Sequence, residues 1–243
     1  MKALKNIKNK KITIGGWMQT SSLDNAEIIS RSSFDWITID LEHGNISNEK
    51  LKNMIRVIKS KKKIVLARLQ SKEPNSVGNV LDAGVDGIII PHVNSNQDVR
   101  KIIDVSFYPP IKNRGIGFSK SNDFGANLKK TLKKNKNLIV IAMIENKHGL
   151  KNLDKILDEK YLDGVFIGPY DLSASLDIFG KFKDRKFIKS INEIKTKALK
   201  KKKLCGIHVV DYDVKQLKKR INEKFNFIAF SMDSVVMRSY EKK

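Results

Sequence analysis

Several apolar segments of this sequence end in a charged residue, and that placement suggests chemistry. The segment 138–144 runs directly into Glu145, and the segment 165–167 is followed four residues later by Asp171. An unpaired charge inside an apolar sheet is costly, so these groups are expected at strand ends. When parallel strands carry functional groups at their carboxyl ends, those groups converge on one site.

Glu145 and Asp171 follow two consecutive predicted strands. Neighbouring parallel strands lie about 4.8 Å apart, so two such carboxylates can share one hard divalent cation and leave positions for water and substrate. Alternatively, each carboxylate caps the helix that follows its strand, and Asp171, which precedes Leu172 and Ser173, suits a helix N-cap. Spacing alone leaves both interpretations open.

His43 closes a polar cluster, with Asp40 and Glu42, that follows the apolar segment 36–39. A neutral imidazole beside a carboxylate is a typical general base near neutral pH. A lone histidine is more often a hydrogen-bonded polar group without such a role, but the position of His43 at the same strand mouth favours function. Asp82 could orient His43 or could solvate a helix end.

Arg68 ends another apolar segment of this kind. An arginine at a strand mouth can stabilise an enolate or a carboxylate with fixed donors. It could instead form a salt bridge to Asp40 or Glu42, and the two roles are compatible.

Three further histidines are expected to lie outside the chemistry. His92 and His208 each lie in a strand-like segment, and both are interpreted as packing or supporting groups rather than metal ligands. His148 is expected at the exposed start of a helix.

The elements that must position these residues recur as strand followed by helix. The predicted strands are short, rich in Ile and Val and without strict alternation, as expected for parallel strands covered on both faces. They fall at 12–17, 35–41, 64–69, 86–92, 138–144, 163–169, 204–210 and 226–232. Eight strands alternating with helices predict a (β/α)8 TIM barrel, as one domain over residues 1–243. No close internal repeat at a fixed period is found.

Composition restricts the classes of protein. With 40% apolar and 30% charged residues over 243 positions, the chain can bury one sizeable core. Cys205 is the only cysteine, which excludes an intrachain disulfide and favours a reducing compartment. The basic segment 1–11 lacks the apolar stretch of a signal peptide, and no segment is long enough for a membrane span. A cytoplasmic protein without membrane contact is therefore expected.

The net charge of +22 raises the question of nucleic acid. Lysine supplies most of this charge, whereas specific readers of bases and phosphates favour the planar fork of arginine. The lysines are scattered over predicted helices. We therefore expect a solvated basic surface and no specific nucleic-acid partner, and weak, salt-sensitive binding to polyanions remains compatible with this.

Several motifs, taken together, resemble the HpcH/HpaI aldolases along nearly the whole chain. The motifs, in the order of that family, are Gly16-Trp17, Asp40-Leu41-Glu42-His43-Gly44, Leu81-Asp82-Ala83-Gly84, Ile144-Glu145 and Gly168-Pro169-Tyr170-Asp171-Leu172-Ser173. These are metal-dependent class II aldolases that cleave 4-hydroxy-2-oxo acids into pyruvate and an aldehyde. The resemblance implies a small 2-oxo acid as substrate.

The resemblance implies roles for individual residues. Glu145 and Asp171 would bind Mg²⁺, Mn²⁺ or Co²⁺, which would chelate the keto and carboxylate oxygens of pyruvate. Backbone amides at Tyr170 and Asp171 would hold the pyruvate carboxylate, and Arg68 would stabilise the enolate oxygen. Met143 stands where the family usually has a substrate-contacting glutamine. Because a thioether cannot donate a hydrogen bond, and because Tyr170 replaces a commonly small residue, a shifted aldehyde specificity is expected.

The remaining implied roles concern the proton and the assembly. His43, made more basic by Asp82, would manage the proton of the substrate hydroxyl, while Asp40 and Glu42 would order the metal's waters and neighbouring side chains. A homo-oligomer, hexamer or trimer, is implied, with the terminal helix at 234–240 exchanged between subunits. Two alternatives stay open: a related barrel lyase acting on a thioester or another oxo acid, and a basic binding protein built on the same scaffold.

Overall fold

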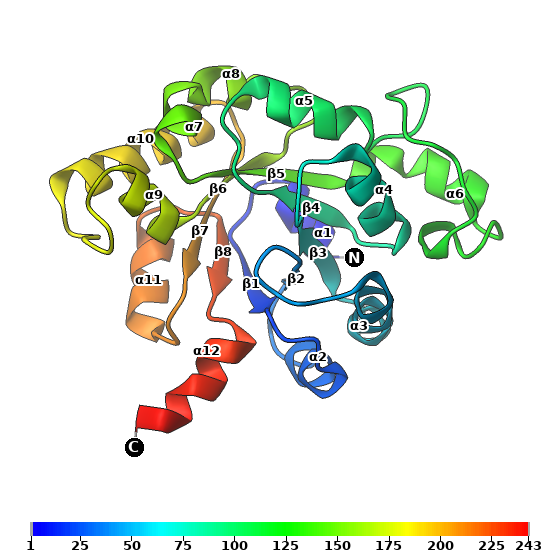
Figure 1. Cartoon of the computed structure of the whole chain (residues 1–243), viewed down its shortest axis with the longest axis horizontal. Helices are drawn as coiled ribbons and strands as arrows, with labels where there is room; N and C mark the ends of the chain where they lie inside the picture. Colours follow the sequence, from blue (N-terminus) through cyan, green and yellow to red (C-terminus); the bar gives the residue numbers. More distant parts are fainter. Residues whose placement is uncertain (1, 243) are drawn as a thin grey trace.

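Eight parallel strands form a closed barrel, in chain order, in the computed structural model, which describes residues 2–242 (Figure 1). The strands are β1 (Thr13–Met18), β2 (Trp36–Asp40), β3 (Ile64–Arg68), β4 (Gly87–Ile90), β5 (Ile139–Ile144), β6 (Gly164–Ile167), β7 (Leu204–Val209) and β8 (Phe227–Phe230). Pairing of β1 with β8 closes the barrel. The predicted (β/α)8 architecture is confirmed, and each predicted strand overlaps an observed one.

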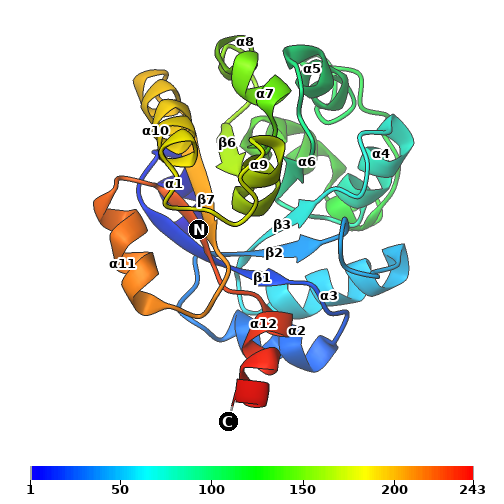
Figure 2. The same ribbon diagram turned by 60° about the vertical axis from the view of Figure 1, so that its left-hand side comes forward.

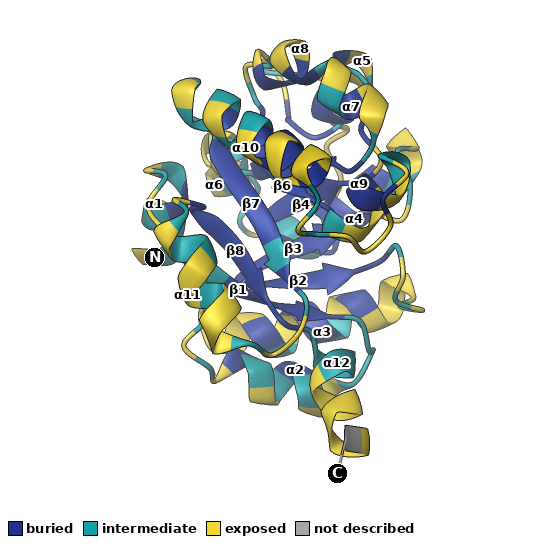
Figure 3. Ribbon diagram, turned by 90° about the vertical axis from the view of Figure 1, so that its left-hand side faces the viewer, coloured by how far each residue is buried: buried dark blue, intermediate teal, exposed yellow. Residues whose placement is uncertain are grey.

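Helices surround the barrel and present one side to it, so that buried and exposed residues alternate along them (Figure 3). The helices are α1 (Lys2–Lys8), α2 (Leu23–Ser30), α3 (Asn48–Ser60), α4 (Pro74–Asp82), α5 (Asn96–Asp104), α6 (Leu128–Lys133), α7 (Lys147–Lys151), α8 (Leu153–Leu157), α9 (Pro169–Ser175), α10 (Arg185–Lys200), α11 (Val214–Asn222) and α12 (Asp233–Arg238). Short 3₁₀ turns occur at Lys120–Asn122, Asn135–Asn137 and Ser239–Lys242.

The core has two layers, which explains why the strands read as continuous apolar runs. Along β5, Ile139, Ile141 and Met143 belong to the cluster inside the barrel. The alternate residues, including Val140 and Ile144, pack in the shell between strands and helices. Both faces of each strand are therefore buried, and no polar alternation is required.

The amino-terminal end of the barrel is closed by α1. Ile7 is fully buried and packs with the cluster inside the barrel, and Lys8 donates to the carbonyl of Leu138 and to Asp163 at 2.8 and 2.9 Å. The interior above it is filled by large rings, among them the stacked pair Trp36 and Phe227, whose centroids lie 4.2 Å apart. The barrel is therefore a packed core that opens only at its other end.

A polar side chain precedes each even-numbered strand at this closed end and bonds the preceding odd-numbered strand. In each case the side-chain oxygen of the Asp or Asn accepts a hydrogen bond from the backbone N–H of a residue in the odd-numbered strand. The backbone N–H of the same Asp or Asn donates to the carbonyl of that strand residue. The pairs are Asp35 with Ile14, Asp86 with Val65, Asp163 with Val140 and Asn226 with Cys205. This fourfold structural repeat has uneven spacing in the sequence, in agreement with the absence of a fixed period.

The terminal helix α12 extends away from the barrel in both views (Figures 1 and 2). None of its residues is buried, and Val236 and Met237 are exposed. The predicted exchange of this helix between subunits stays a prediction, because a single chain does not test it. Among residues 2–242, no helix combines the length and the apolar character that crossing a membrane requires.

Candidate active site

The carboxyl ends of β2 and β3 hold a buried ion pair. Asp40 and Arg68 are direct register partners at the ends of these strands. The guanidinium of Arg68 donates through Nε to Asp40 Oδ1 at 2.9 Å and through Nη2 to Asp40 Oδ2. Asp40 also accepts from the indole of Trp17 and from the backbone amides of Glu42 and His43. The anticipated salt bridge is confirmed, and it fixes the guanidinium plane.

Glu42 and His92 continue this network across the mouth of the barrel, which is the end where the carboxyl ends of the strands meet. Glu42 Oε2 lies 2.9 Å from Nη1 of Arg68, and Glu42 Oε1 lies 2.8 Å from Nε2 of His92. The other ring nitrogen of His92, Nδ1, lies 3.2 Å from Glu145 Oε1. His92 therefore connects the β2–β3 side of the mouth to the β5–β6 side.

Glu145 directly follows β5 and has a side chain that is only 2% exposed. Its Oε1 accepts a hydrogen bond of 2.6 Å from the backbone N–H of His92. Its Oε2 receives no hydrogen bond within residues 2–242 and lies against Gly168, where an added Cβ would come within 2.6 Å of it. Glycine at position 168 therefore permits the close approach of β6 to this carboxylate.

Asp171 lies in the first turn of α9, beyond the end of β6, and is exposed. Strand β6 pairs with β5 through Ile144 and Ile167, so the two predicted metal ligands follow neighbouring strands, as expected. Met143 lies beneath them in β5, buried inside the barrel. Tyr170 is 41% exposed, and its ring packs against Phe182 with centroids 5.1 Å apart.

The electrostatics of the mouth differ between its two sides. Burial raises the pKa of Glu145, and the negative charges of Glu42 and Asp171 raise it further, against the opposing effect of His92. Burial would also raise the pKa of Asp40, but the hydrogen bonds and charge of Arg68 outweigh it and lower that pKa. Among residues 2–242, the acidic groups on the β5–β6 side, Glu145 and Asp171, form no ion pair with a lysine or an arginine.

His43 and Asp82 do not meet within this chain. His43 is exposed, and among the described residues its ring has no hydrogen-bond partner. Asp82 instead forms an ion pair of 2.7 Å with Arg114, in the segment that follows α5. Within this chain Asp82 pairs with Arg114 and not with His43, and the orientation of His43 by Asp82 stays a prediction.

His208 lies below the mouth, inside the barrel, where its ring centroid is 4.9 Å from that of Trp17. Its Nε2 is 3.1 Å from the carbonyl oxygen of Ser231, and loss of water around the ring lowers the pKa of His208 to about 4. Trp17 in turn donates to Asp40 at 3.2 Å. The expectation of a packing or supporting role fits this position, whereas His92 reaches the mouth itself.

The strand predicted over 86–92 is shorter in the structure. β4 ends at Ile90, and Pro91 separates His92 from the strand. The sequence feature that could have placed His92 at the site is the one that identified Glu145, namely a polar residue just beyond an apolar strand.

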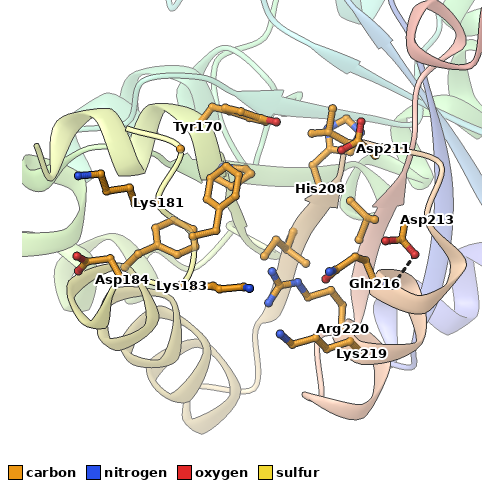
Figure 4. Close-up of a pocket in the computed structure, with 17 residues that line it drawn as sticks. Tyr170, Lys181, Lys183, Asp184, His208, Asp211, Asp213, Gln216, Lys219 and Arg220 are labelled. Atoms are coloured by element: carbon orange, nitrogen blue, oxygen red, sulfur yellow. Dashed lines mark hydrogen bonds between the residues drawn. The ribbon is translucent and has the colours of Figure 1, made fainter. Parts of the chain in front are cut away.

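A cavity of about 610 Å³ opens beside the mouth, between the α9–α10 loop and α11. Tyr170, His208 and Asp211 lie at one end of it, and Lys183, Lys219 and Arg220 lie at the other (Figure 4). Its walls adjoin the carboxyl end of β7, whereas Glu145 and Arg68 are not among its lining residues. The cavity therefore lies next to the charged network and does not contain it.

The side chains at the mouth can be compared with those that bind divalent metal ions in other proteins. Within residues 2–242, no group of three or more His, Cys, Asp or Glu side chains is arranged to hold a metal ion. Glu145 and Asp171 supply two carboxylates, and Glu145 Oε2 has no other hydrogen-bond partner there. Magnesium-like ions commonly bind one or two carboxylates and keep waters or substrate oxygens in their other positions. The residues present therefore fit such an ion.

The fold and the charged mouth define a TIM-barrel enzyme, since polar groups from successive strands converge at the carboxyl end. The sequence matches the HpcH/HpaI aldolase/citrate lyase family over residues 13–239. The chain belongs to that family, and it is a carbon–carbon lyase of the aldolase type. The resemblance seen in the sequence is confirmed, and the predicted retro-aldol activity agrees with it.

Individual relatives support this assignment. The chain is 28% identical over 236 residues to 5-keto-4-deoxy-D-glucarate aldolase of Citrobacter koseri, covering 96% of this chain and 91% of the relative. A family protein from Burkholderia cenocepacia superposes with a TM-score of 0.93 at 21% identity, covering 99% and 96% of the two chains. An HpcH/HpaI aldolase from Desulfitobacterium hafniense superposes with a TM-score of 0.91 at 24% identity, covering 98% of this chain and 93% of the other.

Proposed function

We propose that this protein is a divalent-metal-dependent class II aldolase that cleaves a 4-hydroxy-2-oxo acid into pyruvate and an aldehyde, reversibly. The observation that carries the proposal is the buried carboxylate of Glu145, which has one oxygen bonded to the backbone N–H of His92, just beyond β4, and the other directed toward β6. The name of the Citrobacter relative, a sugar-diacid aldolase, supports a polar oxo acid as substrate. Mg²⁺ and Mn²⁺ suit an all-oxygen donor set.

Glu145 and Asp171 would hold the ion, which supplies Lewis-acid stabilisation of the enolate that forms at the keto group. Arg68 directs two of its five N–H groups to Asp40 and its Nη1 faces Glu42, so donors still remain for the developing oxyanion. Because Asp40 fixes the guanidinium, these donors need little reorganisation during the reaction. The free amides at the start of α9, at Tyr170 and Asp171, would bind the pyruvate carboxylate.

His43 would carry out the proton transfer of the reaction. Its exposed imidazole would accept the proton from the hydroxyl at C4 of the substrate as the C3–C4 bond breaks. The bonding electron pair passes to the keto group and forms the enolate of pyruvate, while C4 leaves as the aldehyde. Protonation of the enolate at C3 then completes pyruvate. Met143, buried below the mouth, offers no hydrogen bond to the substrate, which favours a different aldehyde from that of glutamine-containing members.

The whole chain, residues 1–243, would form this one domain, work in the cytoplasm and assemble as a trimer or hexamer. Val236 and Met237 of α12 and Tyr240 of the 3₁₀ turn that follows it are exposed apolar residues, and they support exchange of this terminal segment between copies. The buried state of Cys205, the only cysteine, suits a reducing compartment. Light scattering after gel filtration, with and without residues 233–243, would test the assembly.

The function is tested by pyruvate release from a panel of 4-hydroxy-2-oxo acids, with added Mg²⁺ or Mn²⁺ and with chelator. We expect activity with metal, loss with chelator and recovery on adding the ion back. Glu145→Ala and Asp171→Ala should each abolish it, whereas Glu193→Ala, which removes a half-buried carboxylate that pairs with Lys197 on α10, should not. Full activity in the chelated protein, or in either of the first two variants, would contradict the metal mechanism.

A further inference from the structure

His92 contacts one carboxylate on each side of the mouth. Its Nε2 lies 2.8 Å from Glu42 Oε1 and its Nδ1 lies 3.2 Å from Glu145 Oε1. Glu42 in turn pairs with Arg68, which pairs with Asp40. Polar and charged groups at or just beyond the ends of β2, β3, β4 and β5 therefore form one continuous chain of contacts, and His92 is the link between its two sides.

The two oxygens of Glu145 have different surroundings. Oε1 is approached by both the backbone N–H and the ring Nδ1 of His92, at 2.6 and 3.2 Å. Oε2 has no hydrogen-bond partner in residues 2–242 and faces Gly168 at the end of β6. A carboxylate held through Oε1 cannot rotate freely, so His92 determines that Oε2 is presented toward β6.

The backbone of His92 is adapted to this arrangement. Its φ of 49° is in the left-handed region, which is uncommon for a residue other than glycine. Lys72 donates to the carbonyl of His92 at 2.9 Å and also pairs with Asp98 at 3.2 Å, which holds the loop from outside. A left-handed residue that is retained by its surroundings is often part of a functional site.

Packing does not explain the position of the ring. The side chain of His92 is 58% exposed, whereas those of Glu42 and Glu145 are 9% and 2% exposed. Exposed imidazoles lose conformational entropy when they are fixed, so contacts must hold them. The contacts found here are the two carboxylates, one of which is a proposed metal ligand.

We propose that His92 is a positioning residue of the metal site, which orients Glu145 so that Oε2 is available to the ion. This inference rests on the proposed role of Glu145 as a ligand and adds a residue for which only a packing or supporting role was expected. Groups that orient a metal ligand typically change metal affinity by about 10- to 100-fold when they are removed. His92 would act through Glu145 and Glu42 without binding the ion itself.

The test is the affinity of the intact protein for Mn²⁺, measured by calorimetry and by the loss of the free Mn²⁺ signal in electron paramagnetic resonance. We expect His92→Ala to raise the dissociation constant about 10- to 100-fold. His92→Asn should recover most of the affinity, because its amide nitrogen can take the place of Nδ1 and asparagine tolerates a positive φ. His148→Ala, which removes an exposed histidine on α7, is the matched control and should bind as the parent does.

Kinetics separate positioning from a direct chemical role. At saturating Mn²⁺, the His92→Ala variant should recover nearly the parental kcat, since only the occupancy of the site is impaired. An alanine variant with parental Mn²⁺ affinity, or an asparagine variant that binds no more tightly than alanine, would overturn the proposal. A Glu145→Gln protein that binds Mn²⁺ as tightly as the parent would instead refute the proposed metal site, which is a distinct result.

Discussion

The two ends of the barrel carry the same kinds of polar residue but use them differently. At the closed end, Asp35, Asp86 and Asp163 accept from backbone amides of the preceding strand, and lysines neutralise two of them. At the open end, Glu145 keeps one oxygen unbonded, with other carboxylates close enough to raise its pKa. A carboxylate with both oxygens bonded, as in Asp86 and Asp163, stabilises the fold, whereas the buried Glu145, with one oxygen unbonded at the carboxyl ends of the strands, is available for chemistry.

The largest expected effect is at the open end. Glu145→Gln should lower kcat/KM by at least about 1,000-fold, which corresponds to about 4 kcal/mol of transition-state stabilisation. Its free energy of unfolding should not fall, because the substitution removes a buried charge whose pKa is raised by its surroundings. Steady-state kinetics and urea unfolding of the metal-free protein would check both. A strongly destabilised variant would mean that Glu145 serves the fold.

The opposite outcome is expected for the helix that closes the barrel. Ile7→Ala should lower the free energy of unfolding by about 3 kcal/mol, because Ile7 is fully buried inside the amino-terminal end. The kcat/KM of the folded variant should match that of the parent. Urea unfolding and kinetics below the midpoint of unfolding would measure these. A loss of activity without a loss of stability would show that the two ends are coupled.

Asp163 provides a closer comparison, since it lies just before the strand that leads to Asp171. Asp163→Ala leaves the N–H of Val140 without its side-chain acceptor and Lys8 without its ion pair. We expect a loss of about 2 kcal/mol in the free energy of unfolding and unchanged Mn²⁺ affinity, measured as for His92. Weakened Mn²⁺ binding in this variant would contradict the separation of the two ends.

The smallest effect concerns pH. The pKa of His208 is lowered from 6.5 to about 4, so below pH 6.5 the unfolded chain binds a proton that the folded protein does not. Stability should therefore decrease as the pH falls from 6.5 toward 4. The ring adjoins a cavity, so we expect His208→Gln to remove only about 1 kcal/mol of this decrease. Unfolding curves at several pH values would test it, and identical pH profiles for both proteins would refute it.

Much of the fold could be predicted from the sequence because it depends on local patterns. Each strand is a short run of apolar residues, since both faces are buried, and each run is separated from the next by a helical pattern. The positions of Glu145 and Arg68 at strand ends were likewise predictable, because a charge cannot remain within such a run. The family motifs then identified the aldolase class, which the comparisons confirm.

The tertiary structure decided which of these residues meet. His92 is an ordinary residue after a proline in the sequence, and only the closure of the barrel places its ring between Glu42 and Glu145. Asp82 belongs to a family motif, yet the fold pairs it with Arg114. Local pattern determines where a strand begins and ends, because that depends on neighbouring residues. Contacts between side chains from different strands depend on register and loop path, which only the assembled barrel specifies.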